Sequence, residues 1–181
     1  MEPDFDFLPE VEHESGIKAS ACFQCRKCSN GCPVTFAMDY PPDQIIRFIH
    51  LGLKDLALGS STIWICAACE TCTTRCPNEI DIAGLMDYLK QRALKEKVVL
   101  RDSLTYRFHR VFMDEIARHG RVFEAGILFR YLLVSGQWWS KLADGSWWRD
   151  TNLALKLLRK GRLPLRPHSV AARQEIESLL K

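Results

Sequence analysis

All eight cysteines of this 181-residue chain lie in two short stretches that share one pattern. The first reads CFQCRKCSNGCP, from Cys22 to Pro33, and the second reads CAACETCTTRCP, from Cys66 to Pro77. Both follow the spacing C-x2-C-x2-C-x3-C-P, which is a ligand pattern of bacterial iron–sulfur sites. Three thiolates two residues apart let one short turn hold three corners of a [4Fe-4S] cubane. The repeat therefore predicts two [4Fe-4S] clusters as cofactors.

The fourth cysteine of each motif is expected to bind the cluster of the other motif, as in two-cluster ferredoxins. Cluster one would then be bound by Cys22, Cys25, Cys28 and Cys76, and cluster two by Cys66, Cys69, Cys72 and Cys32. This crossover would join the two motifs through metal. It also explains why the chain carries both, because either motif alone leaves its cluster one ligand short.

Three other uses of the cysteines compete with this interpretation. Disulfides are disfavoured in a reducing compartment, and eight unliganded thiols would leave the repeated spacing unexplained. Structural zinc is the more serious alternative, because four thiolates can bind one zinc ion tetrahedrally. All-cysteine zinc sites usually come as two separated pairs, whereas each motif here packs four cysteines together. Iron–sulfur clusters are therefore favoured.

The segments that must position the cysteines read as helices. Between the motifs, Asp43 is a plausible N-cap for a helix whose apolar stripe contains Ile45, Ile46, Phe48 and Ile49. After the second motif, Asp81 is the expected N-cap of a helix with apolar positions Ile82, Leu85, Met86, Leu89 and Ala93. No segment between the motifs alternates in the manner of a strand. We therefore predict an all-α fold whose helices pack over the clusters.

Beyond Val98 the pattern stays helical, with helices expected over residues 101–120, 122–136, 150–161 and 169–181. The pairs Trp138-Trp139 and Trp147-Trp148 fall between the second and third of these patterns or at the edge of the third. Adjacent tryptophans on a helix cannot both face one core, so at least one of each pair is expected at the surface or in a contact. A partner interface and an ordinary aromatic-rich corner both fit.

Composition and charge narrow the function classes. The net charge is −4 over residues 1–97 and +7 over residues 98–181, which gives the chain its +3. The basic residues are scattered through helical patterns, which favours a docking surface for an acidic partner over a nucleic-acid site. The acidic N-terminus lacks the features of a secretion signal, and no apolar run is long enough to span a bilayer. A cytosolic protein is expected.

No pattern typical of catalysis accompanies the cysteines. The five histidines share no ligand spacing, and the chain has no glycine-rich phosphate loop and no nucleophile elbow. We therefore name no catalytic residues and expect an electron carrier, leaving open whether the chain should be counted as an enzyme.

The paired motifs with a helical connection resemble the alpha-helical ferredoxin domain. Within that group, the stretch STIWICAACETCTTRCPNEIDI before a helix makes the chain most similar to the C subunit of heterodisulfide reductase. The resemblance covers about residues 18–97. It implies an alpha-helical ferredoxin domain with two [4Fe-4S] clusters over residues 18–97. The acidic residues that precede it are interpreted as an N-terminal tail (residues 1–17). The helical and basic pattern that follows predicts a helical C-terminal extension, expected to dock other subunits (residues 98–181), so that the whole fold is all-α.

By resemblance, the chain would relay electrons between two neighbouring subunits of a heterodisulfide reductase-type complex. One of these contains flavin and iron–sulfur clusters, and the other is cysteine-rich and reduces a disulfide. The terminal disulfide stays open, as do the direction of electron flow and the stoichiometry. Two alternatives remain at this stage. One is an iron–sulfur subunit of an organic-acid or hydroxyacid dehydrogenase, and the other is a zinc-stabilised protein-interaction module.

Overall fold

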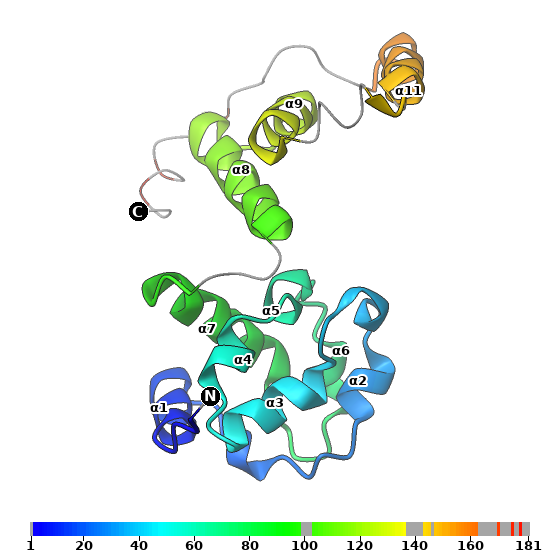
Figure 1. The fold of residues 1–181 in the computed structure, drawn as a ribbon. Helices are drawn as coiled ribbons and strands as arrows, with labels where there is room; N and C mark the ends of the chain where they lie inside the picture. The colour runs from blue at the N-terminus through cyan, green and yellow to red at the C-terminus, as the bar shows by residue number, and fades with distance from the viewer. Residues whose placement is uncertain are drawn as a thin grey trace. The chain divides into compact units, whose positions relative to one another are not determined.

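The computed structural model describes residues 2–98, 103–136, 143–145 and 147–162, together with positions 170, 175 and 178. All regular structure in these ranges is helical, which confirms the all-α prediction. The chain divides into two compact units, Met1–Ser103 and Leu104–Lys181, and each is described by itself (Figure 1). Within the described residues, no helix is both long and apolar enough to cross a membrane.

The first unit is built around two central helices, α3 (Pro42–His50) and α7 (Ile82–Lys95), which we call its long helices. The other elements are α1 (Phe7–Ser15), which has the length of α3, and the short η1 (Ala19–Ala21), α2 (Lys27–Gly31), η2 (Thr35–Ala37), α4 (Lys54–Leu58), α5 (Thr62–Ile65) and α6 (Thr71–Arg75). The core includes the apolar stripes that the sequence predicts on α3 and α7, except that Phe48 is only partly buried. Its fully buried members include Ile45, Ile46, Ile49, Leu85 and Leu89.

Within the N-terminal segment expected as an acidic tail, residues 7–15 form α1 and pack against the rest of the first unit. Phe7 and Val11 lie four residues apart on one face of this helix, and both are fully buried. Their acidic neighbours hide this two-residue stripe in the sequence. Arg92 of α7 pairs with Glu10 at 2.5 Å and thereby holds the polar face of α1.

The two predicted N-caps have different outcomes. Asp81 caps α7, since its carboxylate accepts the backbone N–H of Gly84 at 2.9 Å. The N-cap position of α3 is Pro41, so the prediction for Asp43 is wrong. Asp43 lies inside the first turn of α3 and is only 5% exposed. Pro42 at the first helical position starts the helix two residues earlier than the sequence suggests.

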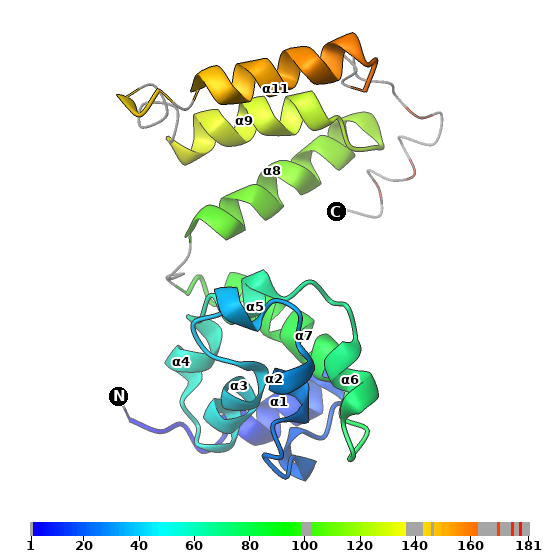
Figure 2. The same cartoon turned by 90° about the vertical axis from the view of Figure 1, so that its right-hand side faces the viewer.

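The second unit contains α8 (Ser103–His119), α9 (Glu124–Ser135) and α11 (Trp147–Arg159) (Figure 2). A buried carboxylate, Glu115 on α8, pairs with Arg130 on α9 at 3.2 Å and lies 3.0 Å from His119. Burying this charge is tolerable because it is paired. These helices agree with three of the expected patterns, although α11 begins at Trp147.

Of the two tryptophan pairs, Trp147 and Trp148 are described. Their ring centroids are 4.6 Å apart and Trp148 is 63% exposed, as expected for at least one member of the pair. Trp138 and Trp139 lie outside the described residues, as does nearly all of the helix expected over residues 169–181.

Candidate metal centres

The two cysteine motifs fold into the same backbone. Helix α6 repeats α2 at an offset of 44 positions, with the same length, and the two helices lie side by side (Figure 1). Before each helix, two non-glycine residues adopt the left-handed conformation: Gln24 (φ 57°) and Arg26 (φ 61°) in the first motif, Ala68 (φ 49°) and Glu70 (φ 58°) in the second. Such residues cost of order 1–3 kcal/mol each and cluster at functional sites. The identical strain in both copies is what a shared ligand-binding turn requires.

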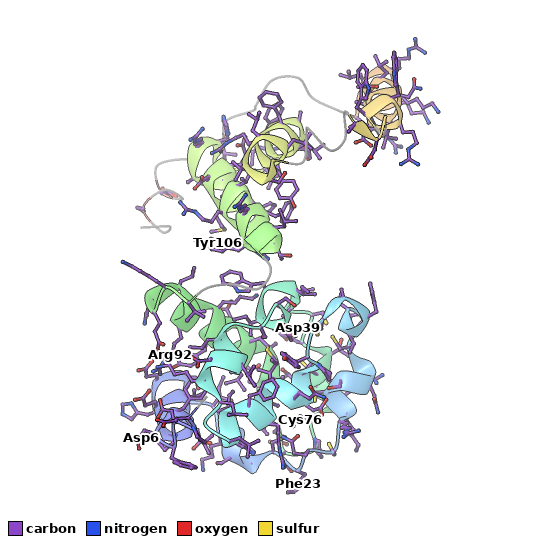
Figure 3. All side chains as sticks on the ribbon, viewed as in Figure 1. Asp6, Phe23, Asp39, Cys76, Arg92 and Tyr106 are labelled. Atoms are coloured by element: carbon purple, nitrogen blue, oxygen red, sulfur yellow. The ribbon has the colours of Figure 1, made fainter. Side chains whose placement is uncertain are left out.

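The first motif surrounds a small cavity whose lining includes four cysteines, Cys22, Cys25, Cys28 and Cys76. The second surrounds a similar cavity whose lining includes Cys66, Cys69, Cys72 and Cys32. Each cavity thus receives three cysteines from one motif and the fourth from the other. All eight cysteines are unpaired thiols in the structure. Cys76, labelled in Figure 3, comes from the end of the second motif to the first cavity.

The N-termini of the two long helices face these cavities. Asp43 of α3 lines the first cavity and Pro42 of α3 lines the second, while Ala83 of α7 lines the second. Ile82, the first residue of α7, lines both cavities and is only 2% exposed. Helix N-termini favour negatively charged groups, and thiolate-bound clusters carry negative charge. A buried apolar side chain therefore separates two sites that each lie beside a helix N-terminus.

One hydroxyl in each motif fixes the motif to its long helix. Ser29 directly follows Cys28, and its Oγ accepts the Asp43 backbone N–H at 3.0 Å. Thr73 holds the same position after Cys72, and its Oγ1 accepts the Ala83 backbone N–H at 3.2 Å. Ser29 also donates to the Asp43 carboxylate, and Thr73 donates to Asp81 at 3.1 Å. The two cavities are thus built with equivalent hydrogen bonds from the helix backbone, whereas the two carboxylates occupy different positions.

Residues outside the two motifs, or at their edges, fix the chain just before the first cysteine of each motif. The carboxylate of Asp39 accepts the backbone N–H groups of Ser61 and Thr62 at 3.0 and 3.1 Å, at the start of the helix α5 that leads into Cys66. The side-chain amide of Asn78 donates to the carbonyl of Ala21, next to Cys22. Neither these residues nor the two motif hydroxyls were predicted from the sequence. Only the hydroxyls leave a sequence signal, since Ser29 and Thr73 occupy the same place in the repeat.

Burial makes several of these thiols harder to deprotonate. Burial raises the pKa of Cys22, Cys28 and Cys72, and neighbouring cysteines raise the pKa of Cys22 and Cys72 further. Cys69 is the contrary case, since its hydrogen bond with Thr71 lowers its pKa. Because iron ligands must be thiolates, metal binding has to displace the protons.

The donor set of each cavity fits a [4Fe-4S] cluster. Four sulfur ligands line each one, and the backbone N–H of Gln24 donates to the sulfur of Cys22 at 3.4 Å. In the described ranges, no group of three or more His, Cys, Asp and Glu side chains is placed to hold one metal ion. The cysteines surround a space and do not converge on a point.

Comparison with known proteins finds a matching domain family and several similar proteins. Residues 18–80 match the family described as "4Fe-4S dicluster domain". The chain is 33% identical over 92 residues to the C subunit of the H(2):CoB-CoM heterodisulfide,ferredoxin reductase of Methanothermobacter marburgensis, covering 51% of this chain and 50% of that protein. It is 33% identical over 88 residues to the iron-sulfur C subunit of the CoB–CoM heterodisulfide reductase of Methanopyrus kandleri, covering 49% and 46%. Over about half of its length, the chain is thus similar to C subunits of heterodisulfide reductases.

These similarities confirm the resemblance found in the sequence. The matched domain indicates two [4Fe-4S] clusters, as predicted from the repeat, and does not favour the zinc module. A protein of Archaeoglobus profundus, named as similar to the C subunit of heterodisulfide reductase, is 29% identical over 94 residues, covering 51% of this chain and 50% of that protein. The chain thus spans about half the length of the curated relatives that it matches.

Proposed function

We propose that this chain is the electron-relay subunit of a heterodisulfide reductase-type complex. It would carry electrons between a neighbour that contains flavin and iron–sulfur clusters and a cysteine-rich neighbour that reduces a disulfide. The relatives described above are named as subunits of such reductases. The observation that carries the proposal is the exchange of the fourth cysteine, which brings Cys76 to the first cavity and Cys32 to the second.

In this proposal the eight cysteines are the cluster ligands. The first cavity uses Cys22, Cys25, Cys28 and Cys76, and the second uses Cys66, Cys69, Cys72 and Cys32. When bound, each cluster supplies reversible one-electron transfer. The chain supplies a rigid frame, because the motif hydroxyls and the two long helices fix the cysteines. Ile82 excludes water between the two cavities, since it lines both and is buried.

The second unit supports a docking role in the same proposal. Helices α9 and α11 expose large apolar side chains, including Leu128, Phe129, Leu133, Leu153 and Leu155, each at least half exposed. Exposed apolar side chains of this kind, next to basic residues, are typical of a protein–protein interface with an acidic rim on the partner. We propose that residues 98–181 dock the neighbouring subunits.

The ligand assignment is tested by comparing three cysteine variants. Cys76→Ser and Cys28→Ser should lose the same component of the EPR spectrum of the reduced protein, and each should lose about four of about eight irons. Cys72→Ser is the matched control and should lose the other component. If Cys76→Ser behaves like Cys72→Ser, the exchange of the fourth cysteine is wrong.

The role in a complex is tested by anaerobic affinity purification from the native host. A large flavoprotein and a second cysteine-rich protein should co-purify with the tagged chain. Co-purification of a hydroxyacid dehydrogenase instead would contradict the proposal. Colourless protein that contains zinc and no iron would exclude electron transfer altogether.

A further inference from the structure

The two cavities share a backbone but differ in their charged lining: Arg26, Lys27 and Asp43 line the first, and none of the residues that line the second is charged. Of these three, only Asp43 is buried. Asp43 and Ala83 are equivalent, because each is the second residue of its long helix and donates its N–H to the motif hydroxyl, Ser29 or Thr73. Asp43 lines the first cavity and Ala83 lines the second. A carboxylate therefore borders one candidate cluster site where a methyl group borders the other.

The Asp43 carboxylate is held in place and shielded from water. Its side chain is 8% exposed, and it accepts a hydrogen bond from the Ser29 hydroxyl. The Nε of Arg26 lies 3.7 Å from the Oδ2 of Asp43, but the Arg26 side chain is 75% exposed. Lys27 also lines the first cavity and is exposed. Water and salt screen the two exposed cations far more than the buried anion.

We propose that Asp43 lowers the reduction potential of the cluster bound in the first cavity and so makes the two clusters inequivalent. This inference rests on the proposed function. Adding an electron increases the negative charge of a thiolate-bound cluster, and a buried carboxylate beside it opposes that change. The potentials of such clusters are set by local charge, hydrogen bonds and exposure. Ala83 exerts no such effect at the second cavity.

Asp43→Asn isolates the charge, because asparagine keeps a side-chain oxygen that can accept from Ser29. In an EPR-monitored redox titration, the first-cavity cluster should become about tenfold easier to reduce, a rise of about 59 mV for a one-electron couple. The second cluster should titrate as in the wild type. Asp87→Asn, an exposed position on α7, is the control for net charge and should shift neither cluster. An unchanged or lower potential in Asp43→Asn overturns the proposal.

Two further variants make the outcome decisive. Cys28→Ser identifies the first-cavity EPR component without using the exchanged cysteine, so an error in ligand assignment and an error in the role of Asp43 are distinguishable. Arg26→Gln removes the cation beside Asp43 and should make the same cluster about threefold harder to reduce. If Asp43→Asn fails to assemble, Asp43→Ala, which reproduces the Ala83 side chain of the second cavity, is measured instead, and an unchanged or lower potential then refutes the proposal. A merely structural role for Asp43 would alter cluster content but would not give opposite shifts in the Asp43 and Arg26 variants.

Discussion

The motif hydroxyls give the sharpest test of how the protein holds its two sites. Ser29→Ala and Thr73→Val each remove one hydroxyl that joins a cysteine motif to the N-terminus of a long helix. The backbone hydrogen bonds are equivalent, but the carboxylates at the two places differ in burial. The two variants should therefore lose different amounts of stability, and Ser29→Ala should lose more.

The magnitudes follow from what each variant leaves unpaired. Ser29→Ala removes the acceptor of the Asp43 N–H and a donor to its 8%-exposed carboxylate, so we expect a loss of about 3 kcal/mol. Thr73→Val removes the acceptor of the Ala83 N–H. The exposed carboxylate of Asp81 keeps its hydrogen bond from the Gly84 N–H, and water can replace the lost hydroxyl. We therefore expect the free energy of unfolding to fall by about 1 kcal/mol. For a unit of about 100 residues, 1 kcal/mol lowers Tm by roughly 4–8 °C.

The assay is anaerobic thermal unfolding of the cluster-loaded protein, followed by circular dichroism at one heating rate. Thr74→Val is the matched control, because the Thr74 hydroxyl is exposed and bonds only within its own turn, to the carbonyl of Glu70. It should change Tm little. If Thr73→Val costs as much as Ser29→Ala, burial of the Asp43 carboxylate does not determine the difference and the reasoning is refuted.

Three other predictions concern the frame around the sites. Arg92→Met should destabilise the first unit by about 2–3 kcal/mol and expose α1 to proteolysis, because the 11%-exposed Arg92 side chain joins α7 to Glu10; unchanged proteolysis would contradict this. Burial tends to raise the pKa of Asp39, but hydrogen bonds from Ser61 and Thr62 outweigh it and lower that pKa below its ordinary value. The stabilisation by Asp39 is therefore present above its unfolded pKa and is lost as the pH falls through the folded value. Between about pH 6 and about pH 3, the free energy of unfolding measured with urea should fall less in Asp39→Asn than in the wild type. The same fall in both proteins would count against the role of Asp39. Removing iron with a chelator in air should lower the helicity of the protein measured by circular dichroism, and unchanged helicity would show that the turns fold without metal.

Much of the first unit could be predicted from the sequence because its signals are local. The cysteine spacing specifies the turns, and the apolar stripes on α3 and α7 follow the 3.6-residue period over several turns. The cap at Asp81 lies directly before its stripe and is equally local. The domain limits and the ligand assignment stay predictions, which the cysteine variants address.

The remaining features depend on contacts between distant residues. Helix α1 has only Phe7 and Val11 to signal it, and its stability comes from packing and from Arg92, about 80 positions away. The burial of Asp43 could not be foreseen, because an aspartate at the start of a helix usually acts as the N-cap. Here Pro42 starts the helix, and the first motif supplies the hydroxyl of Ser29 as the partner instead.

If the two sites were identical, the two clusters would have the same reduction potential, and an added electron would occupy both equally. The backbone of this protein cannot break that symmetry, because the two motifs share their turns, helix lengths and left-handed residues. The difference must come from side chains at equivalent positions. Phe23 borders the first cavity where Ala67 borders the second, and Asp43 stands where the second has Ala83. Of these pairs, only Asp43 and Ala83 differ in charge at a buried position. Which of the two clusters holds an added electron should therefore depend more on Asp43 than on Phe23.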